Sequence, residues 1–323
     1  MAGEASGSQS RSLASRARAG FAILRPVNCL LGGLTVAIGF LNAFAGTPGP
    51  RDFTALAAAW SSYFLVAGGT NAVNDVFDLE VDRVNRPERP LPSGALTVRE
   101  AWGVVVAASV AGTVAALLVG AWYPSPLGWG YAVPPALFSW VGYWYARSGK
   151  VAGFLGNVVV GVSFSAGLLF GAWLVTPVAP IHLVLFFGTS FSLLVARELV
   201  KGAEDLRGDA IREVKTVARA KGVVVATKLA WLFEASAVVQ LLAAVALAPQ
   251  AWLGKATTAP LVVCGALATL AAAVESKSAL ALGAAGRSDS TPADQEAFFH
   301  RASFLLKVAA FFGLLAFLVL SFF

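Results

Sequence analysis

The sequence predicts an all-α integral membrane protein with nine transmembrane helices. Of its 323 residues, 57% are hydrophobic and only 13% are charged, and the mean hydropathy is +0.72. A soluble domain carries about 25% charged and about 45–50% apolar residues, so these values exclude a water-soluble globule. The two cysteines, Cys29 and Cys264, lie in long apolar runs. They predict neither a disulfide framework nor a thiolate metal site.

Each predicted span is a run of mostly apolar residues near the length of about 20 needed to cross a bilayer. In chain order the nine runs cover residues 20–45, 53–76, 101–122, 127–145, 151–175, 181–200, 223–248, 258–274 and 298–323. Residues 1–19 are polar and rich in serine, so we expect a flexible segment ahead of one nine-helix domain, 20–323. The first run is too long for a signal-peptide core and contains Arg25, so we expect no cleavage.

The basic residues predict the orientation of the chain. Of the 24 Lys and Arg, all but Arg51 and Lys255 fall on the side of the predicted bundle that carries the N-terminus. Cytoplasmic loops carry the excess of Lys and Arg, so we expect a multi-pass protein of the cell membrane with a cytoplasmic N-terminus. The odd number of spans then places the C-terminus outside. The net charge of +6 fits basic loops facing anionic lipid rather than nucleic-acid binding.

Acidic residues concentrate in or beside two predicted cytoplasmic loops, at about residues 77–100 and 203–222. In the first, Asn74, Asp78 and Asp82 are spaced i, i+4, i+8 and project from one face of a helix. In the second, Asp205 and Asp209 are spaced i, i+4. A solvated helix end would explain one such pair, but repelling carboxylates at two equivalent membrane boundaries favour a bound cation. Hard oxygen ligands of this kind suit Mg²⁺.

Basic residues are interleaved with the acidic ones. They are Arg83, Arg86, Arg89, Lys150, Arg197 and Lys201. Guanidinium and ammonium groups beside divalent metal ions are suited to binding a diphosphate. The cytoplasmic excess of positive charge explains any single one of them equally well.

Three polar groups inside or beside the predicted spans are further candidates. Arg25 and Asn28 lie near the start of the first span, where they could line a cavity. Asn157 falls inside the fifth span, and polar groups within a span usually face the interior of the bundle.

The motifs resemble those of the UbiA-type intramembrane prenyltransferases. Residues 74–82, followed by 85–94, are similar to the first aspartate-rich signature of that family, and Asp205-Leu-Arg-Gly-Asp209 is similar to the second. Tyr145 with Lys150 resembles the tyrosine–lysine element between the fourth and fifth spans. The resemblance covers all nine spans. It implies a helical bundle around a central cavity, with a cytoplasmic cap formed by the two motif loops.

The implied reaction is transfer of a prenyl group from an allylic diphosphate with two Mg²⁺ ions, for which Mn²⁺ can substitute. On this resemblance Asn74, Asp78 and Asp82 bind one ion, and Asp205 and Asp209 bind the other. The residues expected to bind substrate are Arg25, Asn28, Arg83, Arg86, Arg89, Tyr145, Lys150, Asn157, Arg197 and Lys201.

The acceptor is indicated by residues 25–28 and 197–209, which look most like the archaeal ether-lipid branch of the family. That branch implies geranylgeranyl transfer to the hydroxyl of geranylgeranylglyceryl phosphate, a step of phospholipid biosynthesis. An aromatic acid of the 4-hydroxybenzoate type is the main alternative acceptor. A secondary transporter is a remote alternative, because transporters hold their ions near the bilayer midplane, whereas these carboxylates cluster at the cytoplasmic surface.

Overall fold

The computed structural model describes residues 12–149, 152–205, 216–285 and 292–323, and the secondary structure in these ranges is entirely helical, as the sequence predicts. The helices are α1 (Leu13–Ala22), α2 (Pro26–Ala43), α3 (Pro50–Phe77), α4 (Leu79–Asn85), α5 (Val98–Trp122), the 3₁₀ helix η1 (Gly128–Ala132), α6 (Val133–Arg147), α7 (Phe154–Ala172), α8 (Ile181–Glu204), α10 (Val217–Lys221), α11 (Val223–Leu247), α12 (Trp252–Ala285) and α13 (Pro292–Leu320).

Seven helices of the described residues are long and apolar enough to cross a membrane, which confirms a multi-pass membrane protein. They are α2, α5, α7, α8, α11, α12 and α13. The predicted number of nine is not reached, because α3 and α6 fall outside this set. Helix α6 has only 15 residues, fewer than the roughly 20 that a span requires. Helix α3 carries polar residues along its length, including Ser62, Asn71 and Asp75.

The predicted first span, 20–45, is two helices rather than one. The chain turns at Arg25, which lies at φ 55 in the left-handed region, and Pro26 then starts α2. Proline suits this first helical position, where its missing N–H would have no helical partner. Residues 13–19, expected to be flexible, belong to α1, and an ion pair between Arg16 and Glu100 joins α1 to α5. Residues 1–11 lie outside the described residues.

Other boundaries also differ from the sequence prediction. Helix α12 has 34 residues and continues through Pro260, well beyond the predicted 258–274. The predicted loop 77–100 contains α4, and the predicted loop 203–222 contains the short helix α10. These differences arise because polar segments at the ends of apolar runs also form helices, and a search for apolar runs does not detect them.

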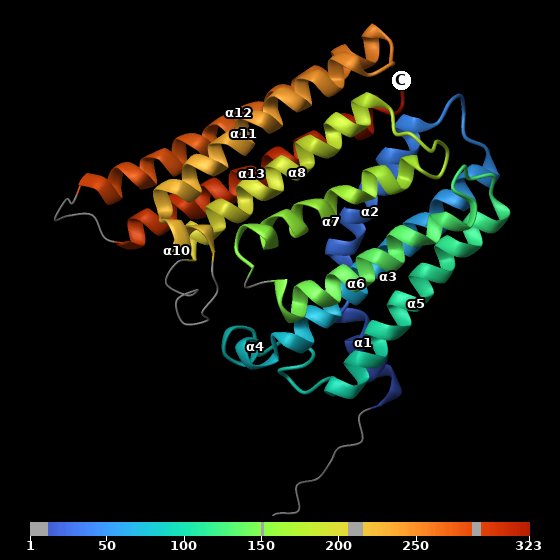
Figure 1. The fold of residues 1–323 in the computed structure, drawn as a ribbon, viewed down its shortest axis with the longest axis horizontal. Coiled ribbons are helices and arrows are strands. Elements are labelled where there is room, and N and C mark those ends of the chain that lie inside the picture. The colour runs from blue at the N-terminus through green and yellow to red at the C-terminus, as the bar shows by residue number, and fades with distance from the viewer. Residues whose placement is uncertain (1–11, 150–151, 206–215, 286–291) are drawn as a thin grey trace, which may run out of the picture.

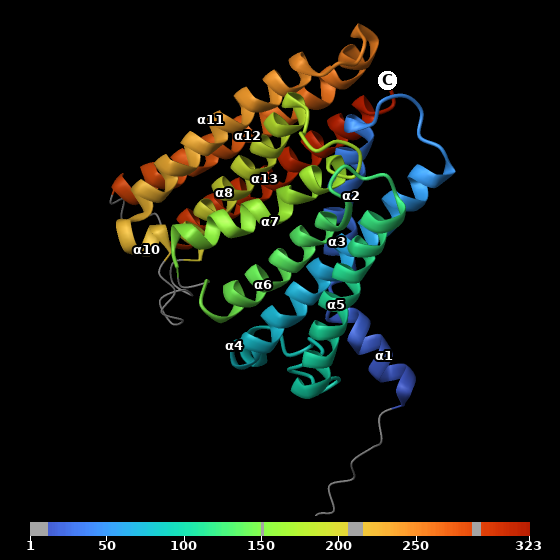
Figure 2. The same ribbon diagram turned by 45° about the vertical axis from the view of Figure 1, so that its right-hand side comes forward.

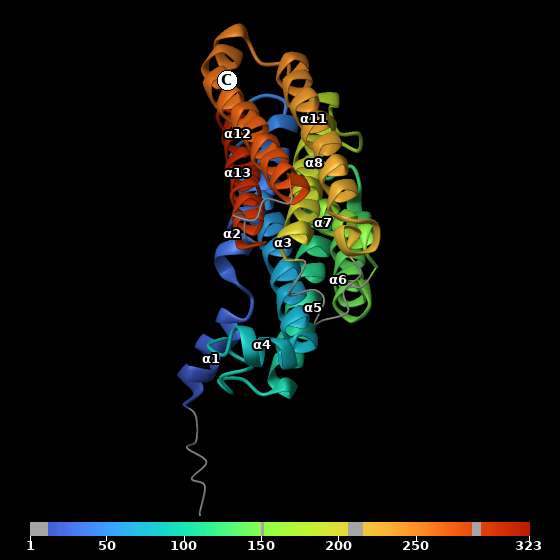
Figure 3. The ribbon, with the colours of Figure 1, turned by 90° about the vertical axis from the view of Figure 1, so that its left-hand side faces the viewer.

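The helices form two groups in contact. Helices α8, α11, α12 and α13 pack around an alanine-rich core, and α2, α3, α5 and α7 form a second core with η1. Figures 1 and 2 show α11, α12 and α13 together on one side and α3, α5 and α6 on the other, with α7 in between. Helices α1 and α4 lie at one end of the bundle, and the C-terminus lies toward the other (Figure 3).

Helices α2 and α7 approach backbone to backbone through glycine. A Cβ at Gly171 would lie 2.0 Å from the carbonyl oxygen of Val36, and a Cβ at Gly39 would lie 1.9 Å from that of Leu168. Small residues allow this close packing in membrane bundles. The contact holds α2 against α7, and α7 lines the cavity described next.

Candidate active site

A cavity of about 400 Å³ lies among α2, α3, α6, α7 and α8. Most of its wall is apolar, with valine, phenylalanine and alanine side chains from α3, α6 and α7. Polar groups gather at the end that meets the C-terminus of α3. They are Asn28, Asn71, Asn74 and Tyr145. We call this end the mouth, and three of the predicted site residues lie there.

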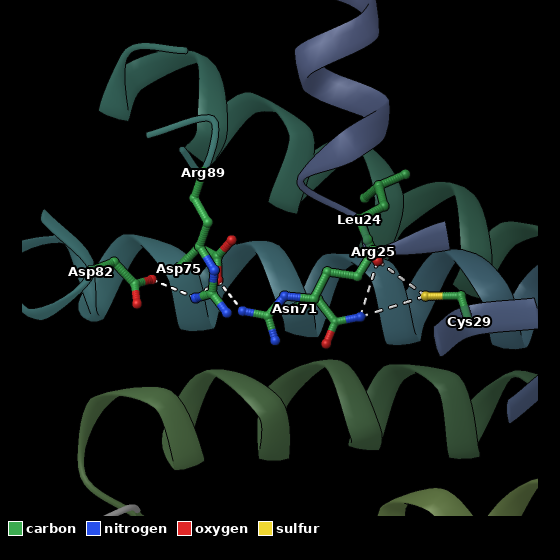
Figure 4. A network of polar contacts seen from close by, with 7 residues as sticks. All are labelled: Leu24, Arg25, Cys29, Asn71, Asp75, Asp82 and Arg89. Carbon is green, nitrogen blue, oxygen red and sulfur yellow. Dashed lines mark hydrogen bonds and ion pairs between the residues drawn. The ribbon is translucent and has the colours of Figure 1, made fainter. Parts of the chain in front are cut away.

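Beside the mouth, the carboxylate of Asp75 is 2% exposed and is held by two arginines. Arg25 forms an ion pair with its Oδ1, and Nη1 of Arg89 lies 3.2 Å from the same oxygen. The same nitrogen of Arg89 donates to Oδ2 of Asp82 at 2.5 Å (Figure 4). This network joins the α1–α2 turn, α3, α4 and the segment after α4. Because a buried carboxylate is stable only when paired, Asp75 fixes how these segments meet.

The turn at Arg25 is strained and is held in place by neighbouring side chains. Among the described residues, Arg25 is the one non-glycine residue with positive φ, a conformation that costs about 1–3 kcal/mol. Nδ2 of Asn71 donates to the carbonyl oxygen of Leu24 at 3.0 Å, and Sγ of Cys29 donates to the same oxygen at 3.1 Å (Figure 4). These bonds fix the turn so that the Arg25 guanidinium reaches Asp75.

The first acidic motif keeps its helical register across the junction of α3 and α4. The amide of Asp78 donates to the carbonyl of Asn74, and the amide of Asp82 donates to that of Asp78, at 2.9 and 2.8 Å. Asn74 lines the cavity, and its Oδ1 is buried without a hydrogen-bond partner. Asp82 is buried and bound to Arg89.

The second motif begins at the end of α8. Nζ of Lys201 lies 3.7 Å from Oδ2 of Asp205, and Nη1 of Arg197 lies 2.6 Å from Oε1 of Glu198. The Nε of Arg197 is buried and has no partner. The predicted site residues Asp209 and Lys150 lie outside the described residues.

Tyr145 lies near Asp78 of the first motif and near Glu198, which precedes the second motif on α8. It lines the cavity from α6, and the carboxylates of Glu198 on α8 and Asp78 at the end of α3 are close enough to act on it electrostatically. Segments far apart in sequence therefore meet at the mouth.

Most of the predicted site residues that the structure describes are not part of the cavity lining. Three of these also lie apart from the ion pairs beside the mouth and at the end of α8. Arg83 is exposed and pairs with Glu80 at 2.8 Å on the surface of α4. Arg86 is exposed at the end of α4. Asn157 is half-buried in the first turn of α7 and is not part of the cavity lining.

Sequence reasoning missed two residues. The four-residue spacing that identifies Asn74, Asp78 and Asp82 does not include Asp75, although Asp75 lies seven positions before Asp82, a spacing that places both on one helical face. His300, from α13, has its Nδ1 2.7 Å from Oε1 of Glu204, next to the second motif. No local signal indicates this contact, because the two residues are 96 positions apart.

The donors at the mouth are suited to a hard cation. Within the described ranges, no group of three or more His, Cys, Asp or Glu side chains is arranged to hold a metal ion. The unpartnered Oδ1 of Asn74 is a buried oxygen at the cavity wall. Mg²⁺ binds through one or two carboxylates together with water and substrate phosphate, so a complete protein cage is not required.

A model of the UbiA prenyltransferase family matches residues 33–285. The chain is 39% identical over 178 residues to the digeranylgeranylglyceryl phosphate synthase of Ignicoccus hospitalis, a match that covers 52% of this chain and 54% of that protein. The match thus spans about half the length of this relative.

Solved structures show the same fold. A structure of digeranylgeranylglyceryl phosphate synthase superposes with a TM-score of 0.70 at 24% identity, over 95% of this chain and 98% of the other. A UbiA homolog from Archaeoglobus fulgidus bound to GPP and Mg²⁺ superposes with a TM-score of 0.63 at 17% identity, over 92% and 99%. At 24% and 17% sequence identity, these similarities establish the fold alone.

Replacing Asp75 with asparagine preserves its size but leaves Arg25 and Arg89 without their shared partner. Breaking a buried pair costs about 3–5 kcal/mol, so we expect Asp75→Asn to lower the thermal unfolding temperature in detergent markedly. Glu80→Gln removes only the exposed pair with Arg83 and is the matched control, with an expected cost of about 0–1 kcal/mol. Equal unfolding temperatures for the two variants would contradict the role of Asp75.

Proposed function

The chain belongs to the UbiA prenyltransferase family, and from that premise we propose that it transfers a geranylgeranyl group from its diphosphate to geranylgeranylglyceryl phosphate. The observation that carries this proposal is a cavity with an apolar wall and a polar mouth, near which lie Asp78 of the first motif and Glu198, which precedes the second motif on α8. An amphiphile with a long apolar tail and an anionic head matches both parts of such a cavity.

The chain's own residues supply binding and exclusion of water. The apolar walls of α3, α6 and α7 surround the tail and keep water away from the reactive allylic carbon. Arg197 has a buried, unpartnered Nε, and Lys201 lies one turn further along α8. We propose that both bind the diphosphate at the mouth.

The cation sites use the oxygen donors of the two motifs. We assign Asn74, Asp78 and Asp82 to one Mg²⁺, and Asp205 and Asp209 to a second. Bound Mg²⁺ neutralises the negative charge that develops on the departing diphosphate. Asp82 is also the partner of Arg89, so Arg89 helps to orient the carboxylate.

In the transfer, the bond between the allylic carbon and the diphosphate oxygen breaks, and a bond from that carbon to the acceptor oxygen forms. The proton of the acceptor hydroxyl passes to the released diphosphate. The protein contributes mainly by holding the two reactants close together and aligned, since an alcohol is a weak nucleophile.

Relatives named digeranylgeranylglyceryl phosphate synthase support the acceptor. An acceptor with its own lipid tail would reach the cavity from within the membrane, and the cations at the mouth would bind its phosphate.

We also infer that α3 and α6 cross the membrane, giving nine spans within a single domain, 20–323. Helix α3 has 28 residues, and η1 with α6 together cover residues 128–147, so both are near the required length of about 20 residues. Helix α3 packs against α2, α5 and α6, which accommodates its polar residues. Helix α6 packs on α3 and exposes large apolar side chains such as Leu137 and Trp140 on its outer face, as a lipid-facing span would. The two motif segments would cap the cytoplasmic side.

The acceptor is tested by direct competition. Purified protein is given geranylgeranyl diphosphate with equal amounts of geranylgeranylglyceryl phosphate and 4-hydroxybenzoate, and products are separated by mass. We expect the digeranylgeranyl ether to dominate. If prenylated benzoate dominates instead, the ether-lipid assignment is wrong and the aromatic-acid alternative is correct.

The metal assignment is tested by chelation and substitution. We expect EDTA to abolish transfer and Mg²⁺ or Mn²⁺ to restore it. Asp78→Asn and Asp205→Asn should each lower kcat by about 10²–10³, the effect typical of losing one group that stabilises developing charge. Glu80→Gln, on the exposed face of α4, should leave kcat unchanged. Near-normal turnover of folded Asp78→Asn and Asp205→Asn would contradict the assignment.

The orientation is tested by labelling single cysteines in intact cells. In a Cys29→Ser, Cys264→Ser background, we expect an impermeant maleimide to label Ser321→Cys near the C-terminus but not Ser93→Cys in the first motif loop. Permeabilised cells should show labelling at both positions. The reverse pattern in intact cells would show that the chain has the opposite orientation.

A further inference from the structure

On the basis of the proposed function, we propose that Trp173 forms the closed end of the cavity and limits the length of the prenyl chain that the enzyme accepts. Trp173 follows α7 and lines the cavity. The position of each lining residue along its helix shows that Trp173 lies at the end opposite the mouth.

The lining residues on α3, α6 and α7 agree on which end of the cavity is the mouth and which is the far end. On α3, the lining runs from Asn74 back to Tyr63, and on α6 from Tyr145 back to Pro134. The two end residues of each path are eleven positions apart, or about 16 Å at 1.5 Å per residue. On α7 the lining runs forward from Val159 to Trp173, or about 21 Å. The cavity is therefore a slot along these helices.

Polarity sets the direction in which a substrate enters the slot. Asn71, Asn74 and Tyr145 lie at the mouth, whereas Pro134, Phe170 and Trp173 line the far end. A diphosphate needs the cations and oxygen donors of the mouth, so its tail must extend toward Trp173. We assign the slot to the donor chain, and varying the chain of the acceptor tests that assignment.

The far end is built to remain in place. The ring of Tyr131 stacks on Phe170 with centroids 4.5 Å apart, and its hydroxyl donates to the carbonyl oxygen of Phe170 at 2.8 Å. Oγ of Ser125 donates to the carbonyl oxygen of Trp173 at 3.2 Å. The segment between α5 and α6 thus supports the residues that close the slot, and close-packed walls resist the extra volume of a longer chain.

A larger side chain at one position of the wall would shorten the slot. Ala67 lines it from α3, seven residues from Asn74, or about 10 Å from the mouth. A phenylalanine at this position would obstruct the middle of the slot. Trp140 provides a matched control, because it lies on α6 with 63% exposure and is not part of the lining.

The experiment measures kcat/KM for geranyl, farnesyl, geranylgeranyl and geranylfarnesyl diphosphates with geranylgeranylglyceryl phosphate as acceptor. We expect Trp173→Ala to raise the preference for the C25 over the C20 donor at least about tenfold, since pockets discriminate by that much or more per methylene. Ala67→Phe should raise the preference for the C10 over the C20 donor by a similar factor. Trp140→Ala should leave both ratios unchanged.

A second series keeps the C20 donor and varies the chain of the acceptor, where Trp173→Ala should change no ratio. Unfolding temperatures establish that each variant is folded, and Ala67→Phe tests the slot without altering Trp173. If both variants keep the wild-type donor ratios within about twofold, or if Trp173→Ala changes acceptor selectivity instead, the proposal is overturned while the transferase activity stands. Absence of transfer by the wild-type enzyme with every donor would contradict the proposed function itself.

Discussion

The geometry of the mouth depends on the burial of one carboxylate. Asp75 faces away from solvent at the end of α3, and an ionised carboxylate there requires positive partners. Arg25 and Arg89 provide them from two different segments. These ion pairs join the α1–α2 turn, α3, α4 and the following segment in one arrangement. The pair with Arg25 requires the strained left-handed backbone at that residue. The neighbouring Asn74 thereby faces the cavity with a free oxygen.

The remainder of the bundle forms a slot of fixed shape behind this mouth. Glycines bring α2 and α7 into backbone contact, and the Tyr131–Phe170 stack supports the far end. An apolar slot with a polar mouth offers different environments to the apolar tail and the anionic head of an amphiphilic substrate. With the proposed substrate, the slot would bind the tail by exclusion of water and the mouth would bind the head by charge, so the reacting carbon would lie where the two environments meet.

The sequence predicts the helical class and both motif stretches because each depends on local features: apolar runs, and oxygen side chains at four-residue spacing. It does not predict the break at Arg25, since the left-handed turn is stabilised by Asn71 on another helix. The pairing of Arg89 with Asp82 and the approach of His300 to Glu204 are likewise tertiary contacts. Helix α3 is less apolar than a typical span because several of its polar residues have partners inside the bundle: Asn71 and Asn74 line the cavity, and Asp75 pairs with its two arginines.

The most direct test is an experimental structure with Mg²⁺ and a non-hydrolysable thio analogue of geranylgeranyl diphosphate. We predict that the diphosphate lies at the mouth beside Asn74 and Tyr145, that Asp75 keeps both arginines, and that the tail runs between α3, α6 and α7 toward Trp173. A tail lying on the lipid-facing surface of the bundle, with the slot empty, would contradict it.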